Sequence, residues 1–446
     1  MALKEELSYL VSVVGGDLVC ANDIKGVNDR VDALTMICRD VLRDSSLCYI
    51  DGLLHYYDGR IYVPCKERVV MSVLGNVLVE NGTSATDIRR MGDMPMSVLI
   101  DKSHARNPNL LCFANGVADI GPSSYESGDG LDMYAFGPEN VVTESLPYPY
   151  VAGASCPLWD AFLEEVMPDA SMRDVMQEFF GLCYLDRSRM SVEKFAIFIG
   201  EGANGKSVIR DVVTAVMGRD NVAAYDAQQI TQEKLQPFLN GKRINFASDM
   251  RSSASFDSAL KALSSGQEVV GRRIYEDPVK VKCPPIVFSM NELPKFCDTT
   301  PAFFRRVLLF RFAVVIPEER RDSSLAAKIC EGELPGVFNW ILRGRDRLLS
   351  NRGVFTRCVA MDNEIAVIAA DEKRRNDPVL RYLAARGLSV SPLYDGQKPV
   401  MVSQDEIVDA LAPQLTRLSL TRTMTSFGVR MQRKSDGRYY WVYEIK

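Results

Sequence analysis

Eight residues near the middle of the chain have the composition of a phosphate-binding loop. They read GEGANGKS from Gly200 to Ser207 and follow the apolar run Phe195–Ile199, which fits a buried parallel strand. Glycines let backbone N–H groups turn toward phosphates, lysine reaches the terminal phosphates, and a serine hydroxyl can ligate magnesium. The strand-to-helix context argues against a chance glycine-rich turn. We therefore predict that ATP and Mg²⁺ bind here, through Gly200, Gly202, Asn204, Gly205, Lys206 and Ser207.

Such a loop requires an acid on a second strand to hold magnesium and orient the attacking water. The segment 241–249 supplies a strand-like run that ends in Asp249, at an interval from the loop that is typical of such folds. Taken alone, Asp249 fits a helix N-cap equally well. Its position favours the catalytic interpretation, and we predict that Asp249 and Ser207 are the metal ligands.

Two further signals follow the acid. The run 285–291 ends a buried strand at Asn291, whose amide can hold the lytic water; a plain turn asparagine is the alternative. Arg305 and Arg306 then precede another strand, and a guanidinium fork suits a γ-phosphate supplied from a neighbouring subunit. A surface salt-bridge pair is the alternative for these arginines.

Composition describes a globular protein with more than one core. The chain has 446 residues, 47% hydrophobic and 25% charged, and a formal net charge of −5. Single cores rarely exceed roughly 250–300 residues, so we expect about three domains. No run is long and apolar enough for a membrane span and no signal peptide is evident, which predicts a cytoplasmic protein without a membrane partner. Eleven scattered cysteines and two histidines favour reduced, mostly buried thiols over structural zinc.

The pattern along the chain divides it into four segments. The first, 1–105, reads as an amphipathic opening helix followed by a hairpin at 48–64 with Asp-Gly turns. Residues 106–190 read as a loop-rich connector and a small helical bundle, the latter with apolar Leu158, Phe162, Leu163, Val166, Val175, Met176, Phe179 and Phe180.

The other two segments are the expected catalytic and DNA-binding parts. Residues 191–352 alternate strand-like and helix-like runs, as a three-layer α/β nucleotide-binding domain requires, and end in amphipathic helices. A linker at 373–378 precedes 376–446, where helices and a hairpin turning at Asp436 and Gly437 favour a winged helix. The fold class predicted is α/β.

Basic residues that could bind DNA concentrate in two places, as an acidic protein requires. Lys280 and Lys282 share one face of a second hairpin strand, opposite Val279 and Val281, although a solvated strand face is the plain alternative. The C-terminal segment carries a cluster of basic side chains that includes Arg422 and Arg430.

The order of these motifs resembles superfamily 3 helicases of the phage and plasmid primase-helicase type, related to poxvirus and satellite-phage replication proteins. NPNLLCFANGVADI is similar to an N-G-V-x-D connector, CPLWDAFLEEV and QEFFG to a helical collar, and ALKALSSGQEVVGRRIY to the B′ motif. IVFSMNELP matches the sensor strand, FFRRV the arginine finger and ELPGVFNWIL the helix behind it. The similar segments extend over most of the chain.

The resemblance implies an AAA+-like ATPase core with an N-terminal collar region. It implies Asp249 as Walker B acid, where the family usually has Glu, Asn291 as sensor, and Arg306 or Arg305 as finger. It assigns Lys261, Arg272, Lys280 and Lys282 to the B′ region and its DNA-facing hairpin.

These observations predict a hexameric ATP-dependent helicase that moves along single-stranded DNA, in the 3′-to-5′ direction implied by the resemblance. Its expected partners are single-stranded and forked DNA, other copies of itself in a homohexamer, and a separate primase or polymerase, since no such module is recognisable in the chain. An ATP-gated origin-binding or scaffold protein and a DNA packaging motor remain as alternatives. A rolling-circle nickase is disfavoured because paired metal-binding histidines are missing from the sequence.

Overall fold

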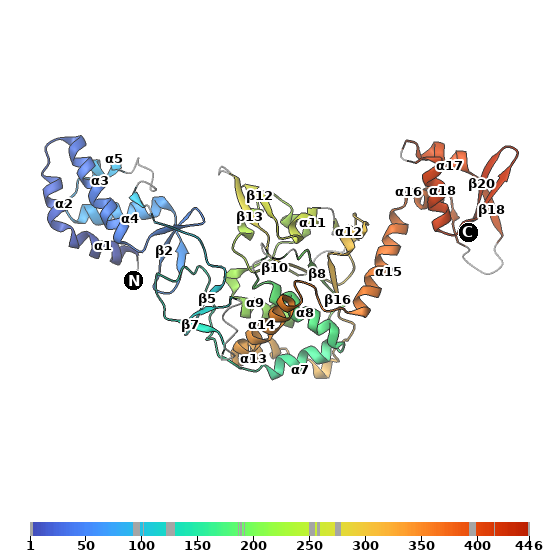
Figure 1. Ribbon diagram of the computed structural model, residues 1–446, viewed down its shortest axis with the longest axis horizontal. Helices are drawn as coiled ribbons and strands as arrows, with labels where there is room; N and C mark the ends of the chain where they lie inside the picture. The colour runs from blue at the N-terminus through green and yellow to red at the C-terminus, as the bar shows by residue number, and fades with distance from the viewer. Residues whose placement is uncertain are drawn as a thin grey trace.

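The computed structural model describes residues 3–91, 99–100, 102–121, 130–185, 187, 190, 192–248, 255–256, 259–272, 278–391, 398–413 and 415–444. Figure 1 shows an N-terminal part, a central α/β body, and a C-terminal part reached through the long helix α15 (Val359–Asn376). The three largest clusters of buried apolar side chains fall one in each part, within 7–100, 111–361 and 379–442. No helix in these described ranges is long and apolar enough to cross a membrane.

The N-terminal part packs helices on a small sheet. Its strands, in the order β3-β2-β1-β4, are β1 (Cys48–Ile50), β2 (Leu53–Tyr57), β3 (Tyr62–Pro64) and β4 (Ser103–His104). The predicted hairpin is confirmed, and Asp51 and Gly52 both adopt the positive φ that a tight two-residue turn requires. The helices are α1 (Leu3–Val13), α2 (Gly15–Asn22), α3 (Val27–Asp44), α4 (Glu67–Glu80) and α5 (Ala85–Met91).

The helical content before the hairpin exceeds the single helix that we expected. The longest of these helices, α3, buries Leu34, Ile37, Cys38, Val41 and Leu42, which recur at helical spacing. This amphipathic pattern was present in the sequence and predicts the helix.

The stretch that we expected to be a loop-rich connector contains a three-stranded antiparallel sheet. Its strands are β5 (Leu110–Phe113), β6 (Gly116–Asp119) and β7 (Asp132–Tyr134). A Cβ on Gly116 would lie 2.8 Å from the backbone oxygen of Tyr134, so glycine permits the close approach of β7. The Asn115 side chain exchanges two hydrogen bonds of 2.9 Å with the backbone of Tyr150, which fastens the later proline-containing stretch to this turn.

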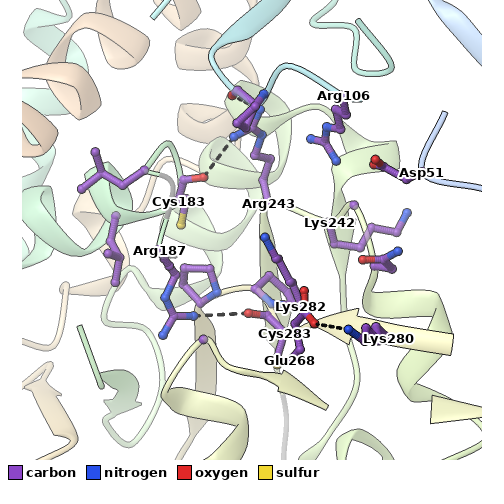
Figure 2. A pocket seen from close by; sticks show the side chains of 18 residues that line it. Asp51, Arg106, Cys183, Arg187, Lys242, Arg243, Glu268, Lys280, Lys282 and Cys283 are labelled. Carbon is purple, nitrogen blue, oxygen red and sulfur yellow. Dashed lines mark hydrogen bonds and ion pairs between the residues drawn. The ribbon is translucent and has the colours of Figure 1, made fainter. Parts of the chain in front are cut away.

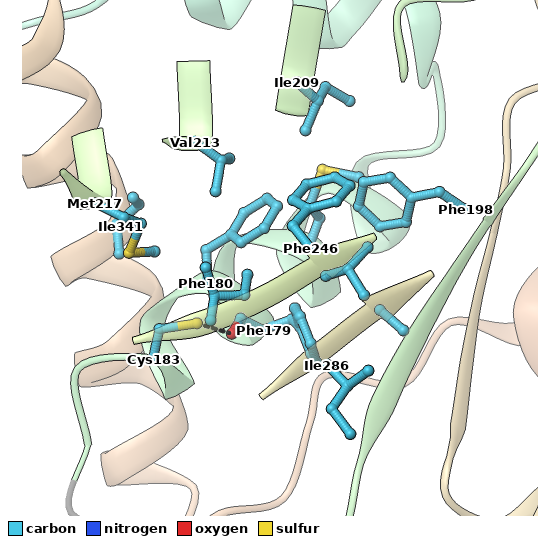
Figure 3. Close-up of a cluster of buried hydrophobic side chains, with 14 of the residues drawn as sticks. Phe179, Phe180, Cys183, Phe198, Ile209, Val213, Met217, Phe246, Ile286 and Ile341 are labelled. Carbon is cyan, nitrogen blue, oxygen red and sulfur yellow. Dashed lines mark hydrogen bonds between the residues drawn. The ribbon is translucent and has the colours of Figure 1, made fainter. Parts of the chain in front are cut away.

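The two collar helices are confirmed, but they do not form a bundle with a core of its own. Helices α7 (Pro157–Val166) and α8 (Ala170–Leu182) contribute to the same cluster of buried side chains as the central strands. Figure 3 shows Phe179 and Phe180 in one buried cluster with Phe198, a strand residue, and Val213, a helix residue; the Phe180 and Phe198 ring centroids are 6.4 Å apart. Leu158 is an exception to the predicted apolar face, being 44% exposed, because Trp159 occupies the buried position instead.

The central sheet has five parallel strands in the order β16-β8-β14-β10-β9. They are β8 (Phe195–Ile199), β9 (Val222–Ala223), β10 (Ile244–Ala247), β14 (Ile286–Met290) and β16 (Val307–Arg311). Helix α9 (Lys206–Met217) follows β8 and buries Ile209, Val212, Val213 and Val216, as predicted. Because the strands are parallel, the ends of β8, β10 and β14 that carry the predicted loop, acid and asparagine share one edge of the sheet.

Short elements connect these strands. They are η2 (Arg219–Asn221), α10 (Ala227–Ile230), η3 (Gln236–Leu239), β11 (Ser255–Phe256), α11 (Ala259–Ser264), β15 (Lys295–Phe296) and α12 (Pro301–Phe304). The predicted second hairpin is confirmed: β12 (Glu268–Arg272) pairs antiparallel with β13 (Pro278–Lys282), and its tip at 273–277 lies outside the described residues.

The predicted helices behind the sheet are also confirmed. They are α13 (Leu325–Gly332) and α14 (Leu334–Ser350), preceded by η4 (Glu318–Arg320). Helix α14 packs on α8 where glycines face backbone: a Cβ on Gly181 would lie 2.3 Å from the Arg345 nitrogen, and one on Gly344 2.2 Å from the Gln177 oxygen.

The linker predicted at 373–378 is wrong, because α15 continues through Asn376 and a single residue, Asp377, separates it from α16 (Pro378–Ala385). Asp377 caps α16 by accepting hydrogen bonds from the Val379 and Leu380 nitrogens. The chain then forms β17 (Leu388–Ser389), β18 (Pro399–Ser403), α17 (Gln404–Leu411), α18 (Arg417–Ser426), β19 (Met431–Lys434) and β20 (Gly437–Glu444). The last two strands make the predicted hairpin, whose two loop residues are Ser435 and Asp436.

Candidate nucleotide site and basic surfaces

The glycine-rich loop turns sharply between β8 and α9. Gly202, Ala203 and Gly205 have φ values of 114°, 48° and 86°, in the left-handed region that favours glycine. A Cβ on Gly205 would lie 2.7 Å from the Phe162 ring, so this glycine also allows α7 to pack beneath the loop. The turn leaves the N-terminus of the twelve-residue helix α9 at the loop, where its backbone N–H groups attract an anion.

Lys206 is held inside the loop. Its side chain is 8% exposed, and its ammonium donates to the backbone oxygen of Gly200 at 2.5 Å and to Asn204 Oδ1 at 3.1 Å. Asn204 is itself 2% exposed, and its Nδ2 donates to the Phe312 oxygen. Asn204 therefore positions Lys206, while its direct contact with a cofactor stays a prediction.

A cavity of about 510 Å³ opens at this edge of the sheet. Lys206 and Ser207 line it from the loop, Ser248 from the end of β10, and Ser289 and Asn291 from the end of β14. Asp249, the predicted acid, lies outside the described residues. The structure thus gathers the loop, the residue next to the acid and the predicted sensor around one volume, which is within the usual size of a ligand site.

The opposite wall of the cavity comes from segments that sequence reasoning did not connect with the site. Phe162 and Glu165 approach from α7, and the segment after β16 adds Ile316, Arg320, Arg321 and Asp322. The Ile316 nitrogen donates to the Ala203 oxygen at 2.9 Å, which ties this segment to the loop. Arg320 pairs with Glu165 at 2.7 Å across the mouth.

Asp322 remains ionised at this rim. Hydrogen bonds from Lys328 and Ser324 lower its pKa to about 2. The mouth of the cavity therefore carries both signs of charge, with Arg320 and Arg321 beside this carboxylate.

The arginine pair lies at the other end of the sheet. The Phe195 nitrogen, at the start of β8, donates to the Arg306 oxygen, whereas the loop follows Ile199 at the end of that strand. A five-residue strand separates the two places by roughly 16 Å. Arg305 and Arg306 are thus not brought to the cavity of their own chain.

The two arginines differ in their surroundings. The Arg306 side chain is 10% exposed and binds Glu193 at 2.7 Å, and it also donates to the Ala302 oxygen. The Arg305 side chain is 64% exposed and binds the same Glu193 at 3.1 Å. Arg305 is therefore the more accessible of the two.

Lys261, predicted to contact DNA, forms an intramolecular ion pair. Its ammonium binds Asp298 and donates to Thr300 Oγ1 at 3.1 Å, and its side chain is 25% exposed. Burial alone would raise the pKa of Asp298, but the hydrogen bonds from Lys261 and Thr300 outweigh it and lower that pKa. These contacts fix α11 to the residues before α12, and a contact of Lys261 with DNA stays a prediction.

The remaining predicted DNA contacts are accessible. Arg272 is exposed at the end of β12, and Lys280 and Lys282 are exposed on β13, where Val281 is buried as predicted and Val279 is 38% exposed. Lys280 lies 3.5 Å from Glu268 on the paired strand. Arg422, on α18, and Arg430, before β19, are also exposed.

Two family models match the chain. The family described as D5 N terminal like matches residues 36–168, and a family of unknown function, DUF5906, matches residues 198–306. The second match extends from β8 to the arginine pair and so contains the loop and the β12–β13 hairpin.

The chain is also similar to a viral protein. A candidate helicase, L207/L206, of Acanthamoeba polyphaga mimivirus is 23% identical over 286 residues, which cover 61% of this chain and 28% of that protein. The chain thus spans little more than a quarter of this relative. The sequence comparison thus shows a partial similarity to one mimivirus protein described as a candidate helicase.

Solved structures of the NrS-1 C-terminal region also match. One A form apo structure has a TM-score of 0.47 at 15% identity, covering 90% of this chain and 96% of the other. Another apo structure of that region has a TM-score of 0.43 at 12% identity with the same coverage. Both scores lie below 0.5.

Proposed function

We propose that this protein is an ATP-dependent DNA helicase of the superfamily 3, AAA+-like class, acting in replication of a phage, plasmid or other mobile element. The observation that carries the proposal is the cavity of about 510 Å³ at the edge of the parallel sheet, where the glycine-rich loop meets the ends of β10 and β14. The similarity to one candidate helicase of mimivirus supports the same class.

We propose parts in phosphate chemistry for the loop, Lys206 and Asn291. The loop N–H groups and the start of α9 cradle the phosphates, and Lys206 moves from its internal acceptors to the terminal phosphates. Asn291, at the end of β14, orients the attacking water. Such positioned donors act on charge that develops on the transferred phosphoryl group.

Magnesium fits the side chains at this edge. Mg²⁺ takes one or two protein ligands and completes its shell with phosphate oxygens and water, so it needs no cluster of acids. The exposed Ser207 hydroxyl at the start of α9 is one ligand, and Asp249, directly after Ser248, is the other. When bound, the ion neutralises charge on the phosphates; the protein's part is to hold it beside Lys206.

The arginines fit a role between subunits. Because Arg305 and Arg306 lie across the sheet from their own cavity, an arginine that reaches a γ-phosphate must reach that of a neighbouring copy. Of the pair, Arg305 is exposed enough to do so, and Arg306 supports it by sharing Glu193. This arrangement supports a closed ring of identical subunits, which we propose to be a homohexamer.

DNA contacts are proposed on two surfaces. The β12–β13 hairpin presents Lys280, Lys282 and Arg272 to a single strand in the centre of the ring. The C-terminal part, with its order of helix, strands, two helices and hairpin, supports a winged helix, in which Arg422 and Arg430 contact duplex phosphates. Priming is left to a separate primase or polymerase.

The division of the chain into four segments stays a prediction, and we propose one change to it. The N-terminal and C-terminal segments, 1–105 and 376–446, each have a separate core. The collar within 106–190 and the ATPase segment 191–352 share one core, so we propose that they move as a single unit.

A strand-displacement assay tests the proposal. Wild-type protein with ATP and Mg²⁺ should separate a forked DNA, and Arg305→Ala protein should bind the same fork without separating it. Hydrolysis of ATP with no strand displacement would favour an origin-binding scaffold or packaging motor. No hydrolysis at all, with or without DNA, would remove the ATPase assignment.

A further inference from the structure

A second cavity, of about 550 Å³, lies at the root of the β12–β13 hairpin and not at the nucleotide site (Figure 2). Its walls come from parts of the chain that are far apart in sequence: the β1–β2 turn, the connector, the end of α8, the segment before β10 and the hairpin itself. Figure 2 shows Lys282 reaching from β13 toward the segment that carries Lys242 and Arg243.

The lining of this cavity is strongly basic. Two acids, Asp51 and Glu268, face six cationic side chains, which are Arg106, Arg187, Lys242, Arg243, Lys280 and Lys282. One further carboxylate, Glu144, touches the wall from behind, which leaves an excess of three positive charges. The whole chain has a net charge of −5, so this concentration runs against its average.

Two of the arginines share a single carboxylate. Arg106 and Arg243 both bind Glu144, and Glu144 is 4% exposed while Arg243 is 7% exposed. One carboxylate cannot neutralise two guanidinium groups. Burial, together with the charge of Arg243, lowers the pKa of Arg106 to about 10, so Arg106 remains charged at neutral pH. Burial also lowers the pKa of Arg243.

Arg187 adds a charge with no carboxylate partner among the described residues. Its guanidinium donates to backbone oxygens of Ser264 at 2.5 Å, Val192 at 2.9 Å and Cys283 at 3.3 Å, while its Nε is buried without an acceptor. A half-buried cation that is bonded only to carbonyls is stabilised by an anion placed nearby.

The lysines supply the accessible part. Lys242 is half-buried and donates to the Asp220 oxygen, which uses one of its three protons. Lys282 is exposed, and within the part of the chain that the structure describes its ammonium has no bonded acceptor. The pair Lys280–Glu268 is exposed on both sides and is therefore weak.

We propose that this cavity binds phosphodiester groups of single-stranded DNA, with Lys242 and Lys282 as direct contacts and Arg106, Arg187 and Arg243 as a fixed positive floor. The proposal rests on the proposed function in that the bound strand is the one the hairpin moves. It adds that the strand contacts the base of the hairpin and the segment before β10, besides the hairpin face itself. The same chemistry would accept a free phosphate or pyrophosphate, and continuity with Lys280 and Arg272 on the hairpin favours the polymer.

The test measures the affinity of the full chain for a fluorescent oligothymidylate, without nucleotide, between about 50 and 200 mM salt. For each phosphate contact that is lost, the slope of log affinity against log salt should decrease by about 0.7 for a single strand. Lys242→Ala should therefore decrease the slope by about 0.7, and the double variant Lys242→Ala with Lys282→Ala should decrease it by about 1.4. Lys242→Arg should leave the slope unchanged, because the positive charge is kept. Lys25→Ala, which removes an exposed lysine of the N-terminal part, is the matched control.

The results of this test either support or overturn the proposed binding of DNA in the cavity. Unchanged slopes in both lysine variants would overturn the proposal. It would also be overturned if pyrophosphate, added at the same phosphate concentration as the oligothymidylate, abolished the salt dependence of DNA binding by the wild type. Should Lys242→Ala fail to fold, Lys282→Ala and Lys242→Arg still give the comparison. If the variants show these slopes but the wild type hydrolyses no ATP, the proposed function is refuted and the cavity stays assigned to DNA. If the wild type hydrolyses ATP but the variants leave the slope unaltered, the proposed function stands and the assignment of the cavity is refuted.

Discussion

Replacing either arginine of the pair before β16 should give two distinct defects. Arg305→Ala should leave stability almost unchanged and abolish hydrolysis, because the exposed side chain that we propose to reach a neighbouring subunit is lost. Arg306→Ala should chiefly destabilise the fold, because a buried side chain that anchors Glu193 is lost.

The expected loss of folding stability in each variant follows from how exposed the paired side chains are. Removing one partner of a fully buried ion pair costs about 3–5 kcal/mol, but Glu193 is 27% exposed and keeps Arg305, so we expect about 2 kcal/mol for Arg306→Ala. For the unit formed by residues 106–352, this loss of stability lowers the Tm by roughly 4–8 °C. The pair of Arg305 with Glu193 contributes about 0–1 kcal/mol, since Arg305 is 64% exposed.

Thermal unfolding and ATP hydrolysis separate the two defects. Arg305→Ala mixed with Lys206→Ala should regain part of the wild-type rate, because some interfaces then join an intact loop to an intact arginine. The reasoning is refuted if Arg306→Ala keeps the wild-type Tm and loses hydrolysis, or if Arg305→Ala hydrolyses ATP at the wild-type rate.

Three further results are expected. Gly205→Ala should weaken ATP binding, measured by calorimetry, because its Cβ meets the Phe162 ring and the left-handed φ costs about 1–2 kcal/mol; wild-type affinity would contradict the loop geometry. The double variant Arg422→Ala with Arg430→Ala should reduce the salt slope of duplex binding by about 1.8, whereas an unaltered slope would indicate a protein-docking surface. At pH 8, iodoacetamide should modify exposed Cys20 and spare Cys283, because burial raises the pKa of that thiol to about 12; equal labelling in peptide maps would count against the packing.

The sequence predicted the elements whose signals are local. The strand before the loop, the helix after it and the run ending at Asn291 were each predicted from short apolar runs with adjacent polar residues, and the hairpins from their turns. Alternation also predicted that Val279 and Val281 share a face opposite the lysines; Val281 is buried, whereas Val279 is 38% exposed. Seven of the eleven cysteines are buried, as expected of scattered thiols.

Features that depend on distant contacts were not predictable in this way. The wall formed by Phe162 and Ile316 arises because α7 and the segment after β16 both fold back on the loop. The linker at 373–378 was inferred from charge and a proline, yet a lysine- and arginine-rich last turn suits a helix C-terminus. The ion pairs of Arg305 and Arg306 both depend on Glu193, which is far from both in sequence.

The basic cavity at the root of the hairpin also depends on contacts between residues that are distant in sequence, so it was not predictable from local patterns. Arg106 and Arg187 are far from Lys242 in sequence, and only the fold brings them beside it. A pattern search finds the two lysines of the hairpin and misses the arginines behind them.

The central claim is that the glycine-rich loop is the site of ATP hydrolysis. The most direct measurement is the steady-state rate of phosphate release by wild-type protein and by Lys206→Ala protein, each shown by thermal unfolding to be folded. We predict measurable release by the wild type that depends on Mg²⁺, and loss of at least about two orders of magnitude in the variant, because the lysine ammonium acts on the terminal phosphates. Release at the wild-type rate by a folded Lys206→Ala protein would contradict the account.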